Sequence, residues 1–188
     1  MKESIMKKHV ILLVDASGSM SGYTKETKNS IYSIIKKLSK ETHFTLIFFD
    51  TTEYKIVADD YVKNIEPSLA YLYNANGGTP ITDSVYKAIQ DITNSGGLDL
   101  EQLSQSHKFI IFTDGEENSS KYVTSEDLGR AIEHFSDIFN WEFQFIGPKQ
   151  CQTGITQYTN SIKIKEKNVM LYANISEGLE MMCNATIN

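Results

Sequence analysis

Unbroken apolar segments, rich in β-branched and aromatic residues, recur along the chain. Runs of this kind are typical of strands that are covered on both faces of a sheet. A weaker segment at residues 54–58 follows one of them so closely that the two are predicted to form a hairpin, which places an antiparallel strand at the sheet edge. The apolar runs occupy residues 10–14, 44–49 and 109–112, and a further strand is predicted at 141–146, closed by Gly147-Pro148.

Segments with helical periodicity lie between these strands. Apolar residues recur three and four positions apart, as in helices that bury one face against a core. The clearest examples are residues 31–38, 85–92 and 128–135. Weaker patterns in the last third of the chain predict a short helix near 153–158, a strand around 169–172 and a helix from about 176.

Punctuating residues support these boundaries. Pro80 suits a position at or just before the first turn of the second helix, and Gly96-Gly97 marks the end of that helical region. Thr124 together with Asp127 resembles a capping box at the start of the third helix.

The alternation of strands and helices predicts a doubly wound, Rossmann-like α/β fold. We expect a mostly parallel six-stranded sheet with one antiparallel edge strand and helices on both faces. A length of 188 residues fits a single domain spanning residues 1–188. No internal repeat and no low-complexity linker divides the sequence.

Composition narrows the classes of function. The formal net charge is −6 and the pI is about 5.2, which argues against the basic face that nucleic-acid binding requires. The two cysteines, Cys151 and Cys183, form no CxxC pair and no disulfide framework. The apolar run that begins at Val10 stops at Asp15 and is too short for a secretory core or a membrane span. We therefore expect a cytoplasmic protein that binds neither nucleic acid nor membrane.

Three loops carry the candidate chemistry. Asp15-Ala16-Ser17-Gly18-Ser19 follows the first strand, Gly77-Gly78-Thr79 precedes a helix, and Asp114-Gly115 follows a later strand. In open α/β sheets, ligands collect at the carboxyl ends of the strands, where the strand order reverses. Alternate spacing in the first loop turns one carboxylate and two hydroxyls toward a common point, and Gly18 permits the tight backbone path.

Two carboxylates and three hydroxyls make an all-oxygen ligand set. Such a set suits Mg²⁺, Mn²⁺ or Ca²⁺ and suits zinc or copper poorly. Because only two of the five ligands are charged, the ion would keep open positions that can accept an outside carboxylate. The predicted metal ligands are Asp15, Ser17, Ser19, Thr79 and Asp114.

These loops resemble the three parts of the metal-ion-dependent adhesion site of von Willebrand factor A domains. The segments that carry the resemblance are Asp15 to Ser19, Gly77-Gly78-Thr79-Pro80 and Phe112-Thr113-Asp114-Gly115. It implies that the serine and threonine hydroxyls bind the metal and that the two aspartates bind it directly or through water, exchanging roles when a ligand arrives. Among relatives, the chain looks most like small stand-alone bacterial and phage-type proteins, including the tellurite-resistance-associated ones.

The resemblance implies a non-enzymatic module. Its partner would be a protein that presents an Asp or Glu to the metal, and family analogy points to ATPases of the AAA class or to kinase and phosphatase systems. A regulatory subunit of such a system is one alternative. The other is a metal-assisted hydrolase or phosphotransfer protein, but the three loops offer no histidine or lysine as general base. Aspartyl-phosphate chemistry needs a second acid two residues after Asp15, where this chain has Ser17.

Other polar residues have simpler interpretations. The four histidines form no HxH or HExxH spacing, so the sequence predicts no histidine-ligated zinc site. Asp83 near a helix start is explained by the helix dipole, and Asp50 is expected to shape its hairpin turn. Glu116 and Glu117 are expected in a solvated acidic loop. The histidines are His9, His43, His107 and His134, and the tyrosines that would either line the metal site or pack beneath it are Tyr23, Tyr71, Tyr73 and Tyr122.

Overall fold

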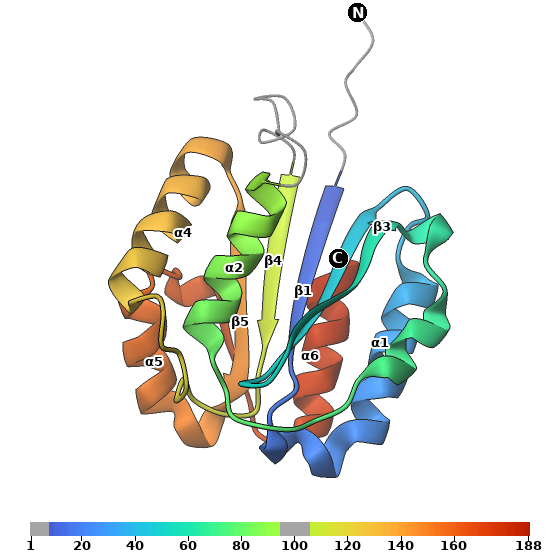
Figure 1. The fold of residues 1–188 in the computed structure, drawn as a ribbon, viewed down its shortest axis with the longest axis horizontal. Helices are drawn as coiled ribbons and strands as arrows, with labels where there is room; N and C mark the ends of the chain where they lie inside the picture. Colours follow the sequence, from blue (N-terminus) through green and yellow to red (C-terminus); the bar gives the residue numbers. More distant parts are fainter. Residues whose placement is uncertain (1–7, 95–105) are drawn as a thin grey trace, which may run out of the picture.

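A single six-stranded sheet organises the chain, in the order β3-β2-β1-β4-β5-β6 (Figure 1). The computed structural model describes residues 8–94 and 106–188, so the expectation for Gly96-Gly97 lies outside the described part. All neighbouring strands are parallel except β3, which pairs antiparallel with β2 at one edge. The strands are β1 (Lys8–Asp15), β2 (His43–Phe49), β3 (Tyr54–Tyr61), β4 (Ser106–Phe112), β5 (Glu142–Pro148) and β6 (Val169–Tyr172).

Helices cover both faces of this sheet, which confirms the predicted fold class. Apolar residues of α1 and α6 pack on one face, and those of α2, α4 and α5 pack on the other (Figure 1). The α-helices are α1 (Thr24–Lys37), α2 (Ile81–Asn94), α4 (Ser125–Phe139), α5 (Gln152–Ser161) and α6 (Ile175–Ile187). The 3₁₀ helices are η1 (Gly18–Tyr23), η2 (Val62–Asn64), η3 (Pro67–Leu72), η4 (Lys149–Cys151) and η5 (Glu166–Asn168).

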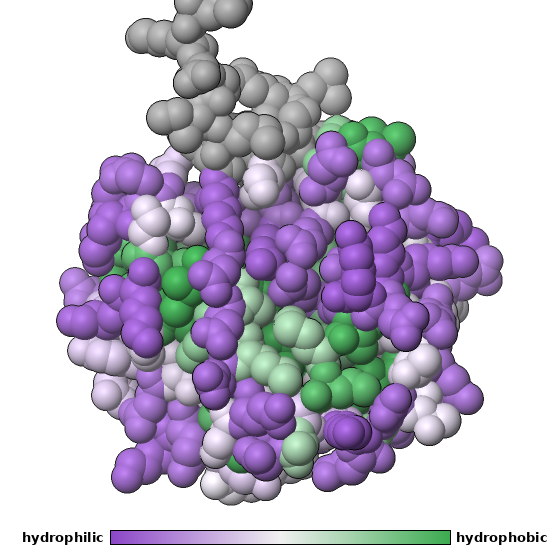
Figure 2. All heavy atoms as spheres, turned by 180° about the vertical axis from the view of Figure 1, so that it is seen from behind, coloured by the Kyte–Doolittle hydropathy of each residue, from purple (hydrophilic) through white to green (hydrophobic). Residues whose placement is uncertain are grey.

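The central strand β1 divides the interior into two cores. Val10, Leu12 and Val14 belong to the core under α1 and α6, whereas Ile11 and Leu13 belong to the core under α2, α4 and α5. All five are 0% exposed, because successive side chains of a strand point to opposite faces and both faces are covered here. Hydrophilic residues cover most of the back of the molecule, with apolar side chains showing between them (Figure 2).

Local signals set the helix boundaries as the sequence predicts. Pro80 directly precedes α2. The Thr124 hydroxyl accepts the backbone N–H of Asp127 at 3.1 Å and donates to its carboxylate at 2.6 Å, which confirms the cap of α4. The last third also has the predicted order of helix, strand and helix, in α5, β6 and α6. No helix in the described ranges is both long enough and apolar enough to cross a bilayer.

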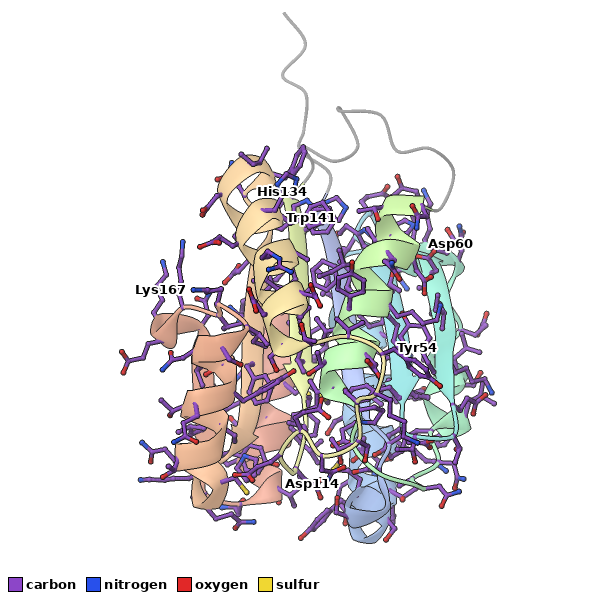
Figure 3. The ribbon with its side chains drawn as sticks, turned by 60° about the vertical axis from the view of Figure 1, so that its left-hand side comes forward. Tyr54, Asp60, Asp114, His134, Trp141 and Lys167 are labelled. Atoms are coloured by element: carbon purple, nitrogen blue, oxygen red, sulfur yellow. The ribbon has the colours of Figure 1, made fainter. Side chains whose placement is uncertain are left out.

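The strand order places the candidate loops together. The chain moves from β1 to β2 on one side and returns to β4 on the other side of β1, so the switch point lies between β1 and β4. The loops after these two strands leave the same edge of the sheet, and Asp114 lies at this edge while His134 and Trp141 lie at the opposite end (Figure 3). A crevice at such a switch point is where open α/β sheets bind ligands.

Candidate metal site

The carboxylate of Asp15 is fixed by hydrogen bonds on both oxygens. Asp15 is the last residue of β1 and is 0% exposed. Its Oδ1 accepts the backbone N–H of Ser17 at 2.7 Å, and its Oδ2 accepts the hydroxyl of Thr113 at 2.6 Å. The end of β1 is thereby bonded to the segment that follows β4.

A chain of hydroxyls leads from this buried carboxylate to the second one. The Oγ atoms of Ser17 and Ser19 are 3.0 Å apart, and the Ser19 hydroxyl donates to Oδ1 of Asp114 at 2.7 Å. Ser17 is 2% exposed, whereas Ser19 is exposed and Asp114 is half-buried. Four of the five predicted ligands therefore lie together. Asp15 is the most buried of them and Ser19 is the most exposed.

The loop that carries Thr79 is held against both other loops through its backbone. The carbonyl of Gly77 accepts the backbone N–H of Gly18 at 2.9 Å. The side chain of Asn118 accepts the N–H of Thr79 at 3.0 Å, and the N–H of Asn118 donates to the Thr79 carbonyl at 3.2 Å. Thr79 itself is 3% exposed. Each of the three loops is thus hydrogen-bonded to the other two.

Two buried tyrosines support the loops from below. The Tyr73 hydroxyl donates to the backbone carbonyl of Asp15 at 2.7 Å, and the Tyr172 hydroxyl donates to that of Thr113 at 2.9 Å. Tyr73 is 0% exposed, so it belongs to the packing beneath the site. Tyr71 and Tyr122, by contrast, are 57% and 90% exposed.

The acidic loop after β4 is attached to the start of α2. A Glu117 carboxylate oxygen accepts the backbone N–H of Thr82 at 2.7 Å, and its other oxygen accepts the N–H groups of Ser119 and Ser120. The expectation that Glu117 is simply solvated is therefore wrong. Asp83 does more than face the helix dipole, because it accepts the backbone N–H groups of residues 121–123.

The structure confirms the predicted role of Asp50 in shaping the hairpin turn. Its Oδ1 accepts the backbone N–H groups of Thr52 and Glu53 and the hydroxyl of Thr52. The turn also contributes to the candidate site, since the hydroxyl of the neighbouring Thr51 accepts the N–H of Gly78 at 2.9 Å.

Electrostatics at the site favour a cation. Burial raises the pKa of Asp15 to about 6, against the hydrogen bonds from Thr113 and Ser17, and the charge of Asp114 adds to the increase. Burial also raises the pKa of Asp114, opposed by the hydrogen bond from Ser19. Within residues 8–94 and 106–188, no basic side chain forms an ion pair with either carboxylate. Two desolvated carboxylates beside hydroxyl oxygens fit a hard divalent ion.

Fold and site together define a doubly wound α/β domain with carboxylates and hydroxyls gathered at its switch point. A family model described as "VWA domain containing CoxE-like protein" matches residues 2–134, more than half of the chain. The chain therefore belongs to the von Willebrand factor A domain family.

Individual relatives are similar over part of their length. Inter alpha-trypsin inhibitor, heavy chain 4 of Mus musculus is 32% identical over 117 residues, which are 59% of this chain and 12% of that protein. A von Willebrand factor A domain-containing protein of Dictyostelium discoideum is 25% identical over 139 residues, 72% of this chain and 6% of that protein. The chain thus spans a small part of the relatives it matches.

Solved structures show the same fold at low sequence identity. The von Willebrand factor type A structure from Catenulispora acidiphila superposes with a TM-score of 0.70 at 19% identity, covering 96% of this chain and 42% of that one. The vWF domain of the type V pili tip protein Mfa5 from Porphyromonas gingivalis has a TM-score of 0.63 at 13% identity, covering 97% of each chain.

We predict that Gly77→Ala destabilises the loop that carries Thr79. Gly77 has a φ of +71°, and a Cβ there would lie 2.5 Å from the Thr51 hydroxyl. The left-handed conformation alone costs about 1–2 kcal/mol for an L side chain, so urea unfolding should show at least that loss. Gly22→Ala is the matched control, because a Cβ at Gly22 meets nothing within 4 Å. Equal stability of the two variants would contradict the prediction.

We predict that Asp15→Asn stabilises the metal-free protein at pH 7. The carboxyl has an ordinary pKa of 3.8 and a pKa of about 6 in the folded chain, a difference worth up to about 3 kcal/mol, less whatever the rearranged Thr113 hydrogen bond costs. Below pH 3.8 the group is protonated in both states. Between pH 3.8 and about 6 the unfolded state ionises first, so wild-type stability is lost as pH rises, and above pH 6 the penalty is constant.

Urea unfolding in EDTA from pH 4 to 8 measures this difference. The advantage of Asp15→Asn over wild type should grow up to about pH 6 and then level off. A variant that is less stable than wild type at pH 7, or a difference that does not change with pH, would show that the buried charge is not the cost we assign to it.

Proposed function

We propose that the chain is a metal-dependent protein-binding module. The observation that carries the proposal is the mutual hydrogen bonding of three loops around two carboxylates that lack a basic partner in the described part of the chain. The proposed ion is Mg²⁺, with Mn²⁺ or Ca²⁺ as substitutes, and its ligands are Asp15, Ser17, Ser19, Thr79 and Asp114.

Differences in burial support binding to an outside group. Asp15, Ser17 and Thr79 lie beneath the surface, and Ser19 is exposed beside the half-buried Asp114. An ion on these oxygens would have its protein ligands on the inner side. When bound, such an ion supplies a positive centre for a carboxylate, and the proposed sixth ligand is an Asp or Glu of a partner protein.

Exposed tyrosines give a partner something further to contact. Tyr23 ends η1, directly after the first loop, and Tyr122 lies in the segment after Asp114. Their side chains are 39% and 90% exposed. Tyrosine is enriched in protein interfaces because it combines a large apolar ring with a polar tip. These positions are therefore proposed to contribute specificity around the metal.

A catalytic role has less support. In the described residues, the side-chain hydrogen bonds of the three loops involve carboxylates, hydroxyls and amides, with no imidazole and no lysine ammonium among them. A metal-assisted hydrolase needs a group that moves a proton at the site. We therefore propose a non-enzymatic module. The regulatory-subunit alternative, with an ATPase or a kinase and phosphatase system as partner, and the likeness to tellurite-associated proteins remain predictions.

We predict that Asp114→Ala abolishes metal binding without unfolding the chain. Asp114 is half-buried and its recorded partner is Ser19, so truncation opens no apolar cavity. Titration of Mn²⁺, followed by electron paramagnetic resonance of the free ion, should show affinity at least about tenfold weaker than wild type. Asp137→Ala removes an exposed carboxylate of α4 and is the control. Wild-type affinity in Asp114→Ala would exclude this site.

We predict that the partner binds only to the metal-loaded protein. Wild type and Asp114→Ala serve as baits in extract of the source cell, each with Mg²⁺ and with EDTA. A true partner should remain on wild type in Mg²⁺ and be absent from the other three samples, because each of them lacks the ion that accepts the carboxylate. Replacing the contacting Asp or Glu of that partner should also release it. Equal retention in EDTA would refute the metal-dependent mode.

A further inference from the structure

Three of the four histidines lie side by side at the sheet edge opposite the candidate metal site. His9 of β1 is paired in register with His43 of β2 and with His107 of β4. Residues paired in register on parallel strands point to the same face of the sheet, so the three rings form a row. The ring centroids of His9 and His43 are 4.4 Å apart, and those of His9 and His107 are 5.0 Å apart.

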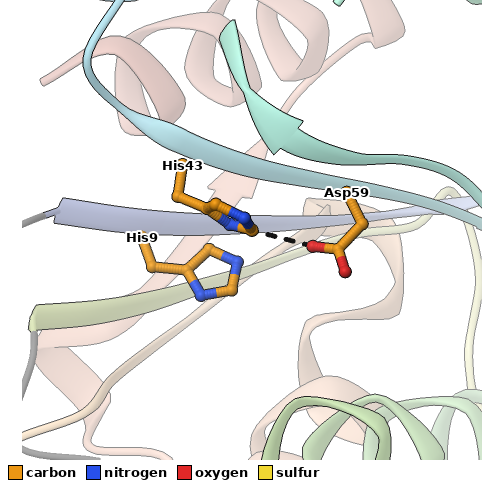
Figure 4. Close-up of side chains that lie close together, drawn as sticks. All are labelled: His9, His43 and Asp59. Carbon is orange, nitrogen blue, oxygen red and sulfur yellow. Dashed lines mark ion pairs between the residues drawn. The ribbon is translucent and has the colours of Figure 1, made fainter. Parts of the chain in front are cut away.

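A carboxylate from the edge strand joins this row. Thr45 of β2 is paired with Asp59 of β3, and its hydroxyl donates to Oδ1 of Asp59 at 2.6 Å. The same hydroxyl lies 2.7 Å from Nε2 of His9. Nδ1 of His43 is 3.7 Å from Oδ1 of Asp59, as Figure 4 shows. Thr45 thus connects His9 with Asp59, and His43 lies against both.

Two details of this cluster favour the binding of a metal ion. Nδ1 of His43 is buried and has no hydrogen-bond partner within the described ranges. In addition, one nitrogen or oxygen from each of His9, His43 and Asp59 lies within 4.8 Å of the others. Ligand atoms around a tetrahedral zinc lie about 3.4 Å apart, given metal–ligand bonds of about 2.1 Å. Small rotations of the half-buried His43 and the exposed Asp59 would close that difference.

We propose that His9, His43 and Asp59 form a second metal site that binds Zn²⁺ or a similar first-row divalent ion. Two imidazoles and one carboxylate are the donor set that zinc prefers, unlike the all-oxygen set at the other edge. Three protein ligands leave one tetrahedral position for water or an outside group. The site is separate from the first, because the six residue steps of extended β1 from His9 to Asp15 span about 20 Å.

The surroundings fit this assignment. Burial, together with the neighbouring His43 and His107, lowers the pKa of His9 well below its ordinary value, so the ring is in the neutral form that binds metals. His107 stacks on Trp141 with ring centroids 4.3 Å apart, which places it beside the ligand set as packing. Asp59 and Thr45 also line an open cavity of about 570 Å³ between β2, β3 and α2, which gives an ion a route to the cluster.

A zinc ion there would link the edge strand β3 to β1 and β2. Asp59 belongs to β3, whereas His9 is the second residue of β1 and His43 is the first residue of β2. Coordination by all three would connect the sheet edge to its centre. An ion that binds the folded chain and not the unfolded chain raises stability in proportion to the logarithm of its concentration. The competing explanation is a simple ion pair between His43 and Asp59, which needs no metal.

Zinc titration of the full chain without a histidine tag tests the proposal. Calorimetry and thermal unfolding are carried out in an Asp114→Ala background, so that the first site does not contribute. We expect one equivalent of zinc and a higher Tm with zinc than with Mg²⁺. Asp59→Asn keeps an oxygen that accepts from Thr45, and His43→Gln alters a half-buried position. Each should weaken zinc binding by more than about tenfold.

The control is His134→Gln, which removes a histidine on α4 whose ring contacts Phe135 and Phe139, and it should bind zinc as the parent does. Cobalt substitution identifies the donors, since a site built on Cys151 or Cys183 would show thiolate charge-transfer bands. Absence of zinc binding in the parent, unchanged binding in Asp59→Asn or His43→Gln, or thiolate bands would each overturn the proposal. None of these results depends on whether Mg²⁺ binds at Asp15.

Discussion

The buried charge of Asp15 is the constraint on which the site depends. Its carboxylate ends a strand that is covered on both faces, so it has no direct access to water. Two short hydrogen bonds, from Ser17 and Thr113, offset part of the cost of burial but leave its pKa raised. A buried carboxylate without a cation is unfavourable. The first and third loops are therefore held in place around a charge that these hydrogen bonds compensate only in part.

The proposed metal site would also explain why several hydrogen bonds from outside the loops fix their backbone. A site that must place several oxygens around one ion loses affinity when any of them moves, so its ligands need fixed positions. Tyr73 and Tyr172 bind the backbone carbonyls of Asp15 and Thr113, and Glu117 binds the start of α2. These three hydrogen bonds act on the backbone, so they position the loops without occupying the side-chain oxygens of the candidate ligands.

The sequence could predict the features whose pattern lies within a single strand, helix or loop. It could not predict contacts between residues that are far apart in the chain. Continuous apolar runs identify the strands, and helical spacing identifies α1, α2 and α4, because burial on a regular element repeats with its period. The first loop is also visible in the sequence, because Asp15, Ser17 and Ser19 lie at alternate positions within five residues. The residues that support the loops follow no such pattern in the sequence. Tyr73 reaches its acceptor across 58 positions and Tyr172 across 59, and a lone tyrosine in a sequence does not show which carbonyl it will bind.

The histidine row shows the same limit in another form. Spacing rules such as HxH detect ligands that one element presents by itself. His9, His43 and His107 come from three strands, and only the register of the parallel sheet brings them together. Register is set by the hydrophobic pattern of each strand and by the turns between strands. Ligand sets built across a sheet therefore become visible only with its topology.

The two proposed sites lie at opposite ends of β1 and differ in their coordination chemistry. Oxygen ligands at Asp15 select hard ions, and imidazoles at His9 select zinc-like ions, so the two proposed sites would not compete for the same metal. Two divalent charges about 20 Å apart interact by about 0.8 kcal/mol at the dielectric constant of water. Salt reduces this further, because the Debye length is about 8–10 Å under ordinary conditions. Residues 10–14 between the two sites are 0% exposed and packed on both faces, so the strand that separates the sites is held on both sides. The distance therefore favours independent action of the two proposed sites, the zinc site joining the edge of the sheet to its centre and the first site binding a partner.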